Sequence, residues 1–169
     1  MATTLRTTLF VSFALVAGLA SPAFAADTGS TLGVSATVSS NCVVSTSALA
    51  FPTVDVTSGA AVDGTGAISV TCTSGTAWTA SADAGEGTGT SLVTRKMESG
   101  ANLLNYVLYT NVGRTTIWGD AVGGTTATIG GTGTGAAQSS TIYGRVPAGQ
   151  TSLPAGAYAD TVAVTVSYL

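Results

Sequence analysis

The feature that most constrains this chain is an alternating segment at its C-terminal end. Every second residue there is apolar, which is the period of a half-buried β-strand. The alternating positions are Val162, Val164, Val166 and Tyr168, followed by Leu169. A strand at the border of a sheet exposes unpaired main-chain groups, which favour pairing with another strand. The segment therefore predicts a β-protein whose final strand needs a neighbour.

A second alternating segment lies near the other end of the chain. Its apolar face consists of Leu32, Val34, Ala36 and Val38, and a short tail rich in Gly, Ser and Thr precedes it. This segment could donate a strand, and the C-terminal strand needs a partner. Together they suggest assembly by strand exchange. Alternation alone does not separate exchange between chains from pairing within one chain.

Residues 1–25 are predicted to be a secretory signal peptide. A single charge, Arg6, precedes an apolar run at 9–20, and Ala-Phe-Ala at 23–25 fits a signal-peptidase site. The run is too short to span a membrane, and no later stretch approaches about 18 apolar residues. We therefore expect an exported protein without a membrane span, whose mature chain begins at Ala26.

The remaining sequence predicts a single all-β domain. Thr, Val, Gly, Ser and Ala dominate it, turn signals recur along it, and no segment has the period of an amphipathic helix. Many short strands in one domain favour an antiparallel sandwich. The expected strands are 32–38, 42–45, 49–51, 67–72, 78–82, 92–97, 104–109, 117–118, 125–129, 141–146 and 158–168.

Two glycine-rich segments are expected to lie outside the strands. Residues 63–66 (Asp-Gly-Thr-Gly) read as a turn, and residues 130–135 read as a flexible connection. The second segment is not a phosphate-binding loop, because no lysine follows it and no helix begins behind it.

Cys42 and Cys72 predict one disulfide. An even number of cysteines in an exported chain is typical of a structural bridge. A loop of this length contributes about 3–4 kcal/mol when it is closed. A zinc site would need further ligands, and the chain has no histidine and no third cysteine.

The charged residues argue against several functions. Only 8% of the residues are charged, the net charge is −3, and no basic stripe is present, so nucleic acid is not an expected partner. Without histidine or a nucleophile–base pattern, we expect no catalytic residues, no metal and no cofactor. The one close carboxylate pair, Asp83 and Glu86, lies in a glycine-rich turn. Turn formation explains the pair better than a weak calcium site or a glycosidase pair does.

Aromatic residues and isolated charges leave two alternatives open. The aromatic side chains can form a sugar-binding face, although core positions suit them better; they are Trp78, Trp118, Tyr106, Tyr109, Tyr143 and Tyr158. The isolated charges can pair with one another or lie in solvent, where each contributes about 0–1 kcal/mol; they are Arg114, Arg145, Asp120 and Asp160.

An ordered series of motifs in the second half resembles the spore coat protein U domain family, which includes subunits of archaic (Csu-type) chaperone–usher pili. The motifs are Leu-Asn-Tyr-Val-Leu-Tyr at 104–109, Arg-Thr-Thr-Ile-Trp-Gly-Asp at 114–120, Thr-Ile-Tyr-Gly-Arg-Val-Pro-Ala-Gly-Gln at 141–150, and residues 154–168. The first half agrees through the alternating segment before Cys42 and through Ile-Ser-Val-Thr-Cys at 68–72.

The resemblance implies an immunoglobulin-like antiparallel β-sandwich that is incomplete, lacks its last strand and is completed by donor-strand complementation. Residues 26–41 would be the N-terminal donor extension, with Leu32, Val34, Ala36 and Val38 facing inward, and residues 42–169 the sandwich. The acceptor groove would lie beside the terminal strand, at Val162, Val164, Val166, Tyr168 and Leu169. Cys42 and Cys72 would join the first two strands of the sandwich.

The partners implied by this resemblance are neighbouring subunits in a head-to-tail polymer, a periplasmic chaperone that binds the end at Leu169, and an outer-membrane usher. The expected location is a surface pilus of a Gram-negative-type bacterium, where it supports adhesion or biofilm formation. The donor segment is short and carries Gly33 and Ala36 where bulkier residues would bind better. The alternative is a self-complemented secreted sandwich that acts as a coat or glycan-binding module.

Overall fold

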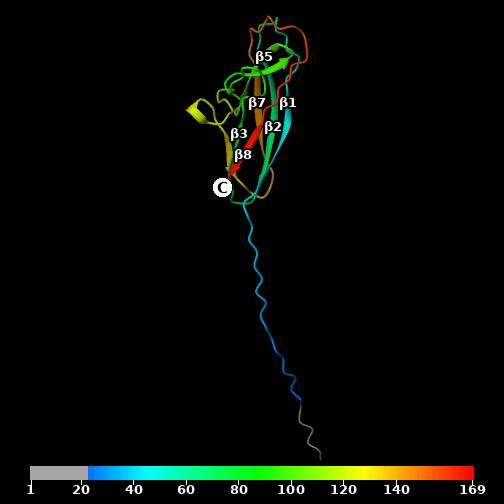
Figure 1. Cartoon of the computed structure of the whole chain (residues 1–169), viewed down its shortest axis with the longest axis vertical. Coiled ribbons are helices and arrows are strands. Elements are labelled where there is room, and N and C mark those ends of the chain that lie inside the picture. Colours follow the sequence, from blue (N-terminus) through cyan, green and yellow to red (C-terminus); the bar gives the residue numbers. More distant parts are fainter. Residues whose placement is uncertain (1–22) are drawn as a thin grey trace, which may run out of the picture. The chain divides into compact units, whose positions relative to one another are not determined.

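The structure, a computed structural model, describes residues 23–169 (Figure 1). The expected signal peptide therefore lies almost entirely outside the described residues. The chain separates into two units, Met1–Ala36 and Thr37–Leu169. In the first unit, residues 23–36 form no helix or strand and their side chains are exposed.

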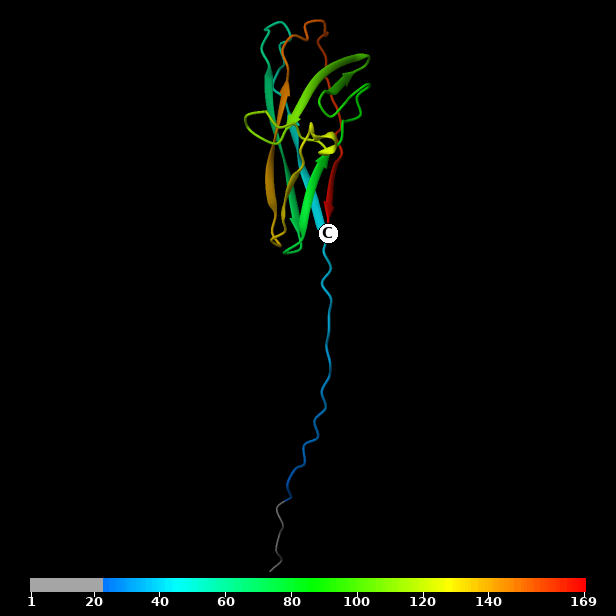
Figure 2. The ribbon, with the colours of Figure 1, turned by 90° about the vertical axis from the view of Figure 1, so that its left-hand side faces the viewer.

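The second unit confirms the predicted all-β sandwich. Its strands are β1 (Cys42–Ala50), β2 (Val62–Cys72), β3 (Ala77–Ala82), β4 (Arg95–Ser99), β5 (Asn102–Tyr109), β6 (Ile129–Thr132), β7 (Gln138–Val146) and β8 (Val164–Tyr168). A single 3-10 turn, η1 (Val122–Gly124), protrudes beside the sheets, and residues 23–169 contain no α-helix. The strands form two sheets with the orders β1-β2-β7-β5-β4 and β6-β3-β8 (Figure 2). Neighbouring strands in both sheets are antiparallel.

The strand order is that of an immunoglobulin sandwich with one position empty. The run β1-β2-β7-β5 follows the order A-B-E-D, and β3-β8 follows C-F. In the complete fold strand G pairs with the outer edge of F. Within residues 23–169, β8 pairs only with β3 and β1 pairs only with β2. The sandwich is therefore open beside β8.

The core forms where the inner faces of the two sheets meet. Alternate residues of β5 and β7 point into it, as the period of two requires. Trp118 is 2% exposed and its indole N–H donates to the main-chain oxygen of Ala80 at 3.1 Å. The buried apolar residues are Ile68, Val70, Cys72, Trp78, Ala80, Ala82, Leu104, Tyr106, Leu108, Trp118, Ile142 and Val146. Because Trp78, Trp118 and Tyr106 belong to the core, the sugar-binding face that included them is wrong.

The predicted disulfide is confirmed. Cys42 and Cys72 are opposite each other in the register of β1 and β2, and their sulfur atoms are bonded. The bridge therefore joins the first two strands within one sheet and closes a loop with a sequence separation of 30.

Several local predictions were wrong. Residues 32–38 form no strand, because a strand needs the main-chain groups of a neighbour. Residues 63–66 lie inside β2, and residues 130–131 lie inside β6. Glycine at 131 lets the Trp78 ring pack closely, because a Cβ there would lie 3.1 Å from that ring, which is tighter than an ordinary contact. The last strand begins at Val164 instead of residue 158, since Ala159 already pairs with Glu98 of β4.

Candidate functional site

An open groove lies where the sandwich lacks a strand. It has a volume of about 1040 Å³ and is bordered by the second half of β1 on one side and by the segment leading into β8 on the other. Buried residues of the five-stranded sheet, together with Trp118, form its floor. The apolar lining includes Leu49, Phe51, Leu104, Ile142, Val162 and Val164.

The β1 side of the groove is shaped by a β-bulge. Ser47 is opposite Ala67 and Ala50 is opposite Thr65, so β1 contains one extra residue between these pairs. An extra residue reverses which side chains face inward. Before the bulge, Thr46 shares the inner face with its partner Ile68, yet it is exposed. An exposed side chain on the inner face shows that nothing in the described chain covers the sheet at this point.

The β8 side of the groove contains two of the five residues predicted there. Val162 and Val164 are half-buried and line the groove. Val166 packs against the core beyond the groove, Tyr168 is 39% exposed, and Leu169 is 98% exposed. The roles assigned to all five residues stay predictions.

The predicted donor residues are exposed. Leu32, Val34 and Val38 have exposed fractions of 88%, 87% and 83%, and Ala36 is also exposed. Large apolar side chains in solvent cost free energy that burial would recover. Their role as donor residues stays a prediction.

A polar network closes one end of the groove. Asp160 lines the groove, and the Tyr106 hydroxyl donates to its Oδ2 atom at 2.6 Å. Its Oδ1 atom accepts main-chain N–H groups from Glu86 and Thr161, both at 2.8 Å. Burial, together with the bond to the Asp160 carboxylate, raises the pKa of Tyr106. The network fixes the chain just before β8.

Arg95 is a buried cation that the sequence analysis missed. It is 0% exposed, and its guanidinium donates to the main-chain oxygens of Asp83, Leu92 and Trp118 at 2.6–3.0 Å. Burial lowers the pKa of Arg95. The sequence signal was its spacing of two residues from Met97, which places both side chains on the same face of a strand. In the structure both lie opposite core residues of β5. Arg95 therefore connects the 83–92 loop to the core.

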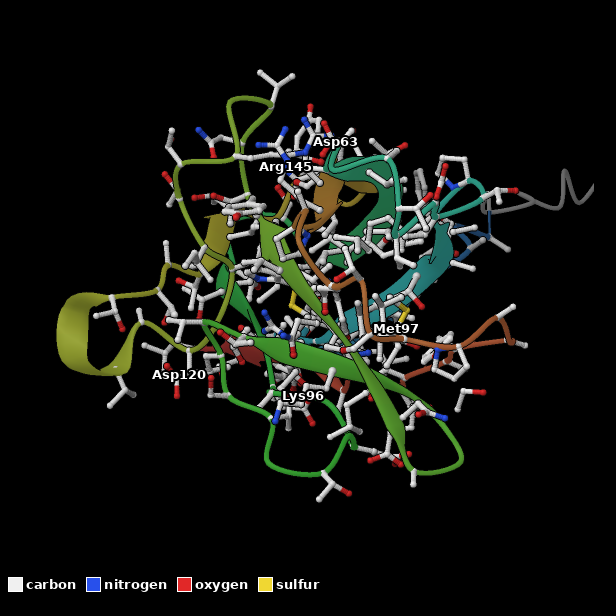
Figure 3. The ribbon with its side chains drawn as sticks, turned by 90° about the horizontal axis from the view of Figure 1, so that it is seen from above. Asp63, Lys96, Met97, Asp120 and Arg145 are labelled. Atoms are coloured by element: carbon white, nitrogen blue, oxygen red, sulfur yellow. A yellow bond between two sulfur atoms is a disulfide. The ribbon has the colours of Figure 1, made fainter. Side chains whose placement is uncertain are left out.

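The arginines pair differently from the prediction. Arg145 donates through two nitrogens to the Asp63 carboxylate at 2.7 and 2.9 Å, and Arg114 lies 3.2 Å from the same carboxylate. Figure 3 shows Asp63 and Arg145 side by side, with Asp120 far away at the base of η1. The hydrogen bond from Arg145 lowers the pKa of Asp63. This cluster stabilises the outer face of the five-stranded sheet.

The carboxylate pair of the 83–89 turn fits the structural interpretation. Asp83 Oδ1 accepts main-chain N–H groups from Gly85 at 2.9 Å and Ala163 at 3.0 Å, so it holds the turn against the entry to β8. No group of three or more His, Cys, Asp or Glu residues suited to a metal occurs among residues 23–169. The same residues include no helix long and apolar enough to cross a membrane.

Comparisons with known proteins agree with this geometry. One solved structure with a similar fold is the CsuC–CsuE chaperone–tip adhesion subunit pre-assembly complex from archaic chaperone–usher Csu pili of Acinetobacter baumannii, with 20% identity and a TM-score of 0.56. The match covers 77% of this chain but only 40% of that chain. No curated protein matches. The model of the spore coat protein U domain matches residues 28–165. The chain therefore belongs to the spore coat protein U domain family.

Proposed function

We propose that this protein is a structural subunit of a surface pilus assembled by the chaperone–usher pathway. The observation that carries the proposal is the unpaired edge of β8 above an apolar groove. An added strand at this position would complete the sandwich. Residues 26–41 of one mature subunit, released by cleavage after Ala25, would occupy the groove formed by residues 42–169 of the next.

The donor segment suits the groove chemically. Its main chain would hydrogen-bond to the free strand edges, and its alternate side chains would enter the groove. Burial of Leu32, Val34, Ala36 and Val38 would stabilise the pair by about 4–8 kcal/mol, at about 1.5–3 kcal/mol for a large side chain. The large side chains among them are exposed in the unpaired chain, so their burial in a groove would supply this free energy.

A contact between the donor segment of one subunit and the groove of the next would produce a filament. Donor and acceptor are different surfaces of the same subunit, and a head-to-tail contact that does not close on itself forms an open fibre. A periplasmic chaperone would fill the groove before assembly, and an outer-membrane usher would exchange it for the next subunit. The pilus would support adhesion or biofilm formation. The chaperone–subunit complex among the structural neighbours supports this pathway.

Substitutions in the donor segment test the proposal. Val34→Asp would place a carboxylate in the apolar groove and abolish fibre formation, as judged by electron microscopy of cells that express the whole operon. Ser35→Asp is the matched control, because its side chain lies on the opposite face of the same strand. Fibres that form normally with Val34→Asp would overturn the donor assignment.

A second measurement separates the proposal from a self-complemented module. A subunit that completes its own sandwich would be a stable monomer with or without partners. A pilus subunit would instead form polymers that a peptide copying residues 28–40 converts to monomers, as measured by size-exclusion chromatography. A stable monomer that ignores the peptide would favour the coat or glycan-binding module.

A further inference from the structure

The inner face of the five-stranded sheet contains three glycines beneath one end of the groove. Gly64 and Gly144 are directly opposite each other in β2 and β7, and Gly66 lies two residues further along β2. Glycine in the middle of a strand destabilises a sheet, because it adds flexibility and packs no side chain. Three of them together on a core face indicate that something must approach the sheet closely.

The groups that approach are Leu49, in the bulged part of β1, and Phe51, the residue directly after β1. A Cβ on Gly144 would lie 2.8 Å from Phe51 Cζ and 2.9 Å from Leu49 Cδ2. A Cβ on Gly66 would lie 2.9 Å from Leu49 Cβ. One on Gly64 would lie 2.9 Å from the main-chain oxygen of Ala50 and 3.0 Å from Phe51 Cδ1. Each of these separations is tighter than an ordinary contact, so a side chain on any of the three glycines would force its neighbours to move. We call this hollow, formed by Gly64, Gly66 and Gly144, the glycine recess.

We propose that the glycine recess determines which side chains a donor strand can place at this end of the groove. Leu49 and Phe51 line the groove, and the recess lets them sink toward the sheet. If the recess were filled, the same two side chains would have to move into the space that a donor side chain enters. The inference rests on the proposed function, because it concerns the selectivity of the same groove.

The bulge and the recess act together. The extra residue of β1 turns Leu49 and Phe51 inward, and the glycines supply the depth that these two large side chains need. The Phe51 ring then lies edge-on to the Tyr106 ring, with centroids 6.2 Å apart, which holds it low in the groove. Loss of either the bulge or the glycine recess would narrow the groove by the size of a side chain.

Gly144→Ala is the sharpest variant for a test. The three atoms nearest to its new Cβ all belong to the side chains of Phe51 and Leu49, so the substitution displaces side chains and leaves the main chain in place. Gly131→Ala is the matched control. It also meets an aromatic side chain, Trp78, at 3.1 Å, but it lies in β6 of the other sheet and does not line the groove.

The acceptor in this test is the full mature chain with its own donor segment disabled by Val34→Asp and Val38→Asp. The probe is a fluorescent peptide of residues 28–40, added during refolding, and its binding is measured by anisotropy. Gly144→Ala should weaken the peptide's binding by about tenfold, the effect of overfilling a packed site. Gly131→Ala should leave the binding within about twofold of the parent, because it is remote from the groove.

A compensating substitution identifies the cause. Leu49→Ala removes one of the two side chains that Gly144→Ala displaces and frees space into which the other, Phe51, can move. The double variant should therefore bind the peptide within about threefold of Leu49→Ala alone. Leu49→Ala by itself should enlarge the groove and shift the preference toward a peptide with Val34→Phe or Val38→Phe. This shift in preference tests the inference even if Gly144→Ala fails to fold, because the Leu49→Ala variant keeps all three glycines.

The outcomes separate two failures. If the parent acceptor binds the peptide but neither Gly144→Ala nor Leu49→Ala changes affinity or preference, the glycine recess does not determine selectivity. If the parent acceptor binds no peptide at all, the proposed donor-strand function is wrong and this inference falls with it.

Discussion

The two ends of the sandwich differ in how completely they are closed, although the same strands border both. At the disulfide end, β1 and β8 approach each other, and the Tyr168 hydroxyl lies 3.4 Å from Asn41 Oδ1. Val70 is 0% exposed there. At the other end, β1 and the segment before β8 separate and leave a groove of about 1040 Å³. A sandwich that lacks an edge strand can thus complete its core at one end only.

The contrast explains how an incomplete fold can persist. A covalent bridge, a short β1–β8 contact and a filled core hold one end, while the other keeps apolar side chains available for a partner. Substitutions at the closed end should destabilise the domain whether or not a donor strand is bound. Substitutions at the open end should act mainly when a donor is present.

The largest expected effect is loss of the disulfide. Cys42→Ser with Cys72→Ser should lower the free energy of unfolding by about 3–4 kcal/mol, since the bridge closes a long loop of the unfolded chain. Urea unfolding with and without the donor peptide measures this loss, which should be equal in the two states. An unchanged stability, or an unchanged yield in the periplasm, would contradict a structural role of the bridge.

Two valines, one at each end of the sandwich, test directly whether the two ends differ. Val70→Ala at the closed end should cost about 2 kcal/mol with or without donor, because it leaves a cavity in a filled core. Val164→Ala in the groove should cost under about 1 kcal/mol in the free chain and more with donor bound, because the donor would bury that side chain further. Equal costs for both valines in both states would show that the two ends do not differ.

Tyr106→Phe should have an intermediate effect. It removes the hydrogen bond to the Asp160 carboxylate, and bonds to charged groups contribute about 1.5–3 kcal/mol. Tyr158→Phe is the control, because its hydroxyl donates to the neutral Pro154 oxygen at 2.8 Å. Its loss should cost about 0.5–1.5 kcal/mol. Thermal unfolding compares the two, and a control as costly as Tyr106→Phe would argue against the Asp160 network.

The smallest expected effect depends on pH and lies on the outer face of the sheet. Because Arg145 and Arg114 lower the pKa of Asp63 below its ordinary value of 3.8, the ion pair stabilises the fold above about pH 4. This stabilisation is lost as the pH falls through the lower folded-state pKa. For such an exposed pair it amounts to about 0.2–1 kcal/mol. Asp63→Asn should lower stability at pH 7 but not at pH 2, and an equal loss at both would exclude the ionic contribution.

Much of the fold could be predicted from local patterns. The period of two along residues 104–109 and 141–146 matches β5 and β7, whose inward residues belong to the core. The cysteine pairing could also be predicted, because only two cysteines are present. The motifs predicted the family, which the domain match confirms.

Other features depend on distant residues and could not be predicted. Residues 63–66 read as a turn and residues 130–135 as a flexible connection, because glycine is common in both. Residues 63–66 and 130–132 lie in strands instead, where Leu49 and Trp78 of other strands approach the glycines closely. Arg95 stands beside Lys96 in the sequence, where its charge indicates no core position, although the fold buries Arg95 among three main-chain oxygens. Asp63 meets Arg145 because β2 and β7 are neighbours, and Arg114 reaches it from the segment after β5, where it also donates to the Gly144 main-chain oxygen.

By itself, the sequence determined the all-β class, the disulfide, the family and the two alternating segments near its ends, because each is a property of residue types at short spacing or of an ordered set of motifs. Only the tertiary structure decided where the groove opens, which residues line it and why three glycines lie beneath it. The physical reason is that a groove is an unfilled space between strands distant in sequence, and its shape depends on a bulge and on side-chain contacts that no local pattern records.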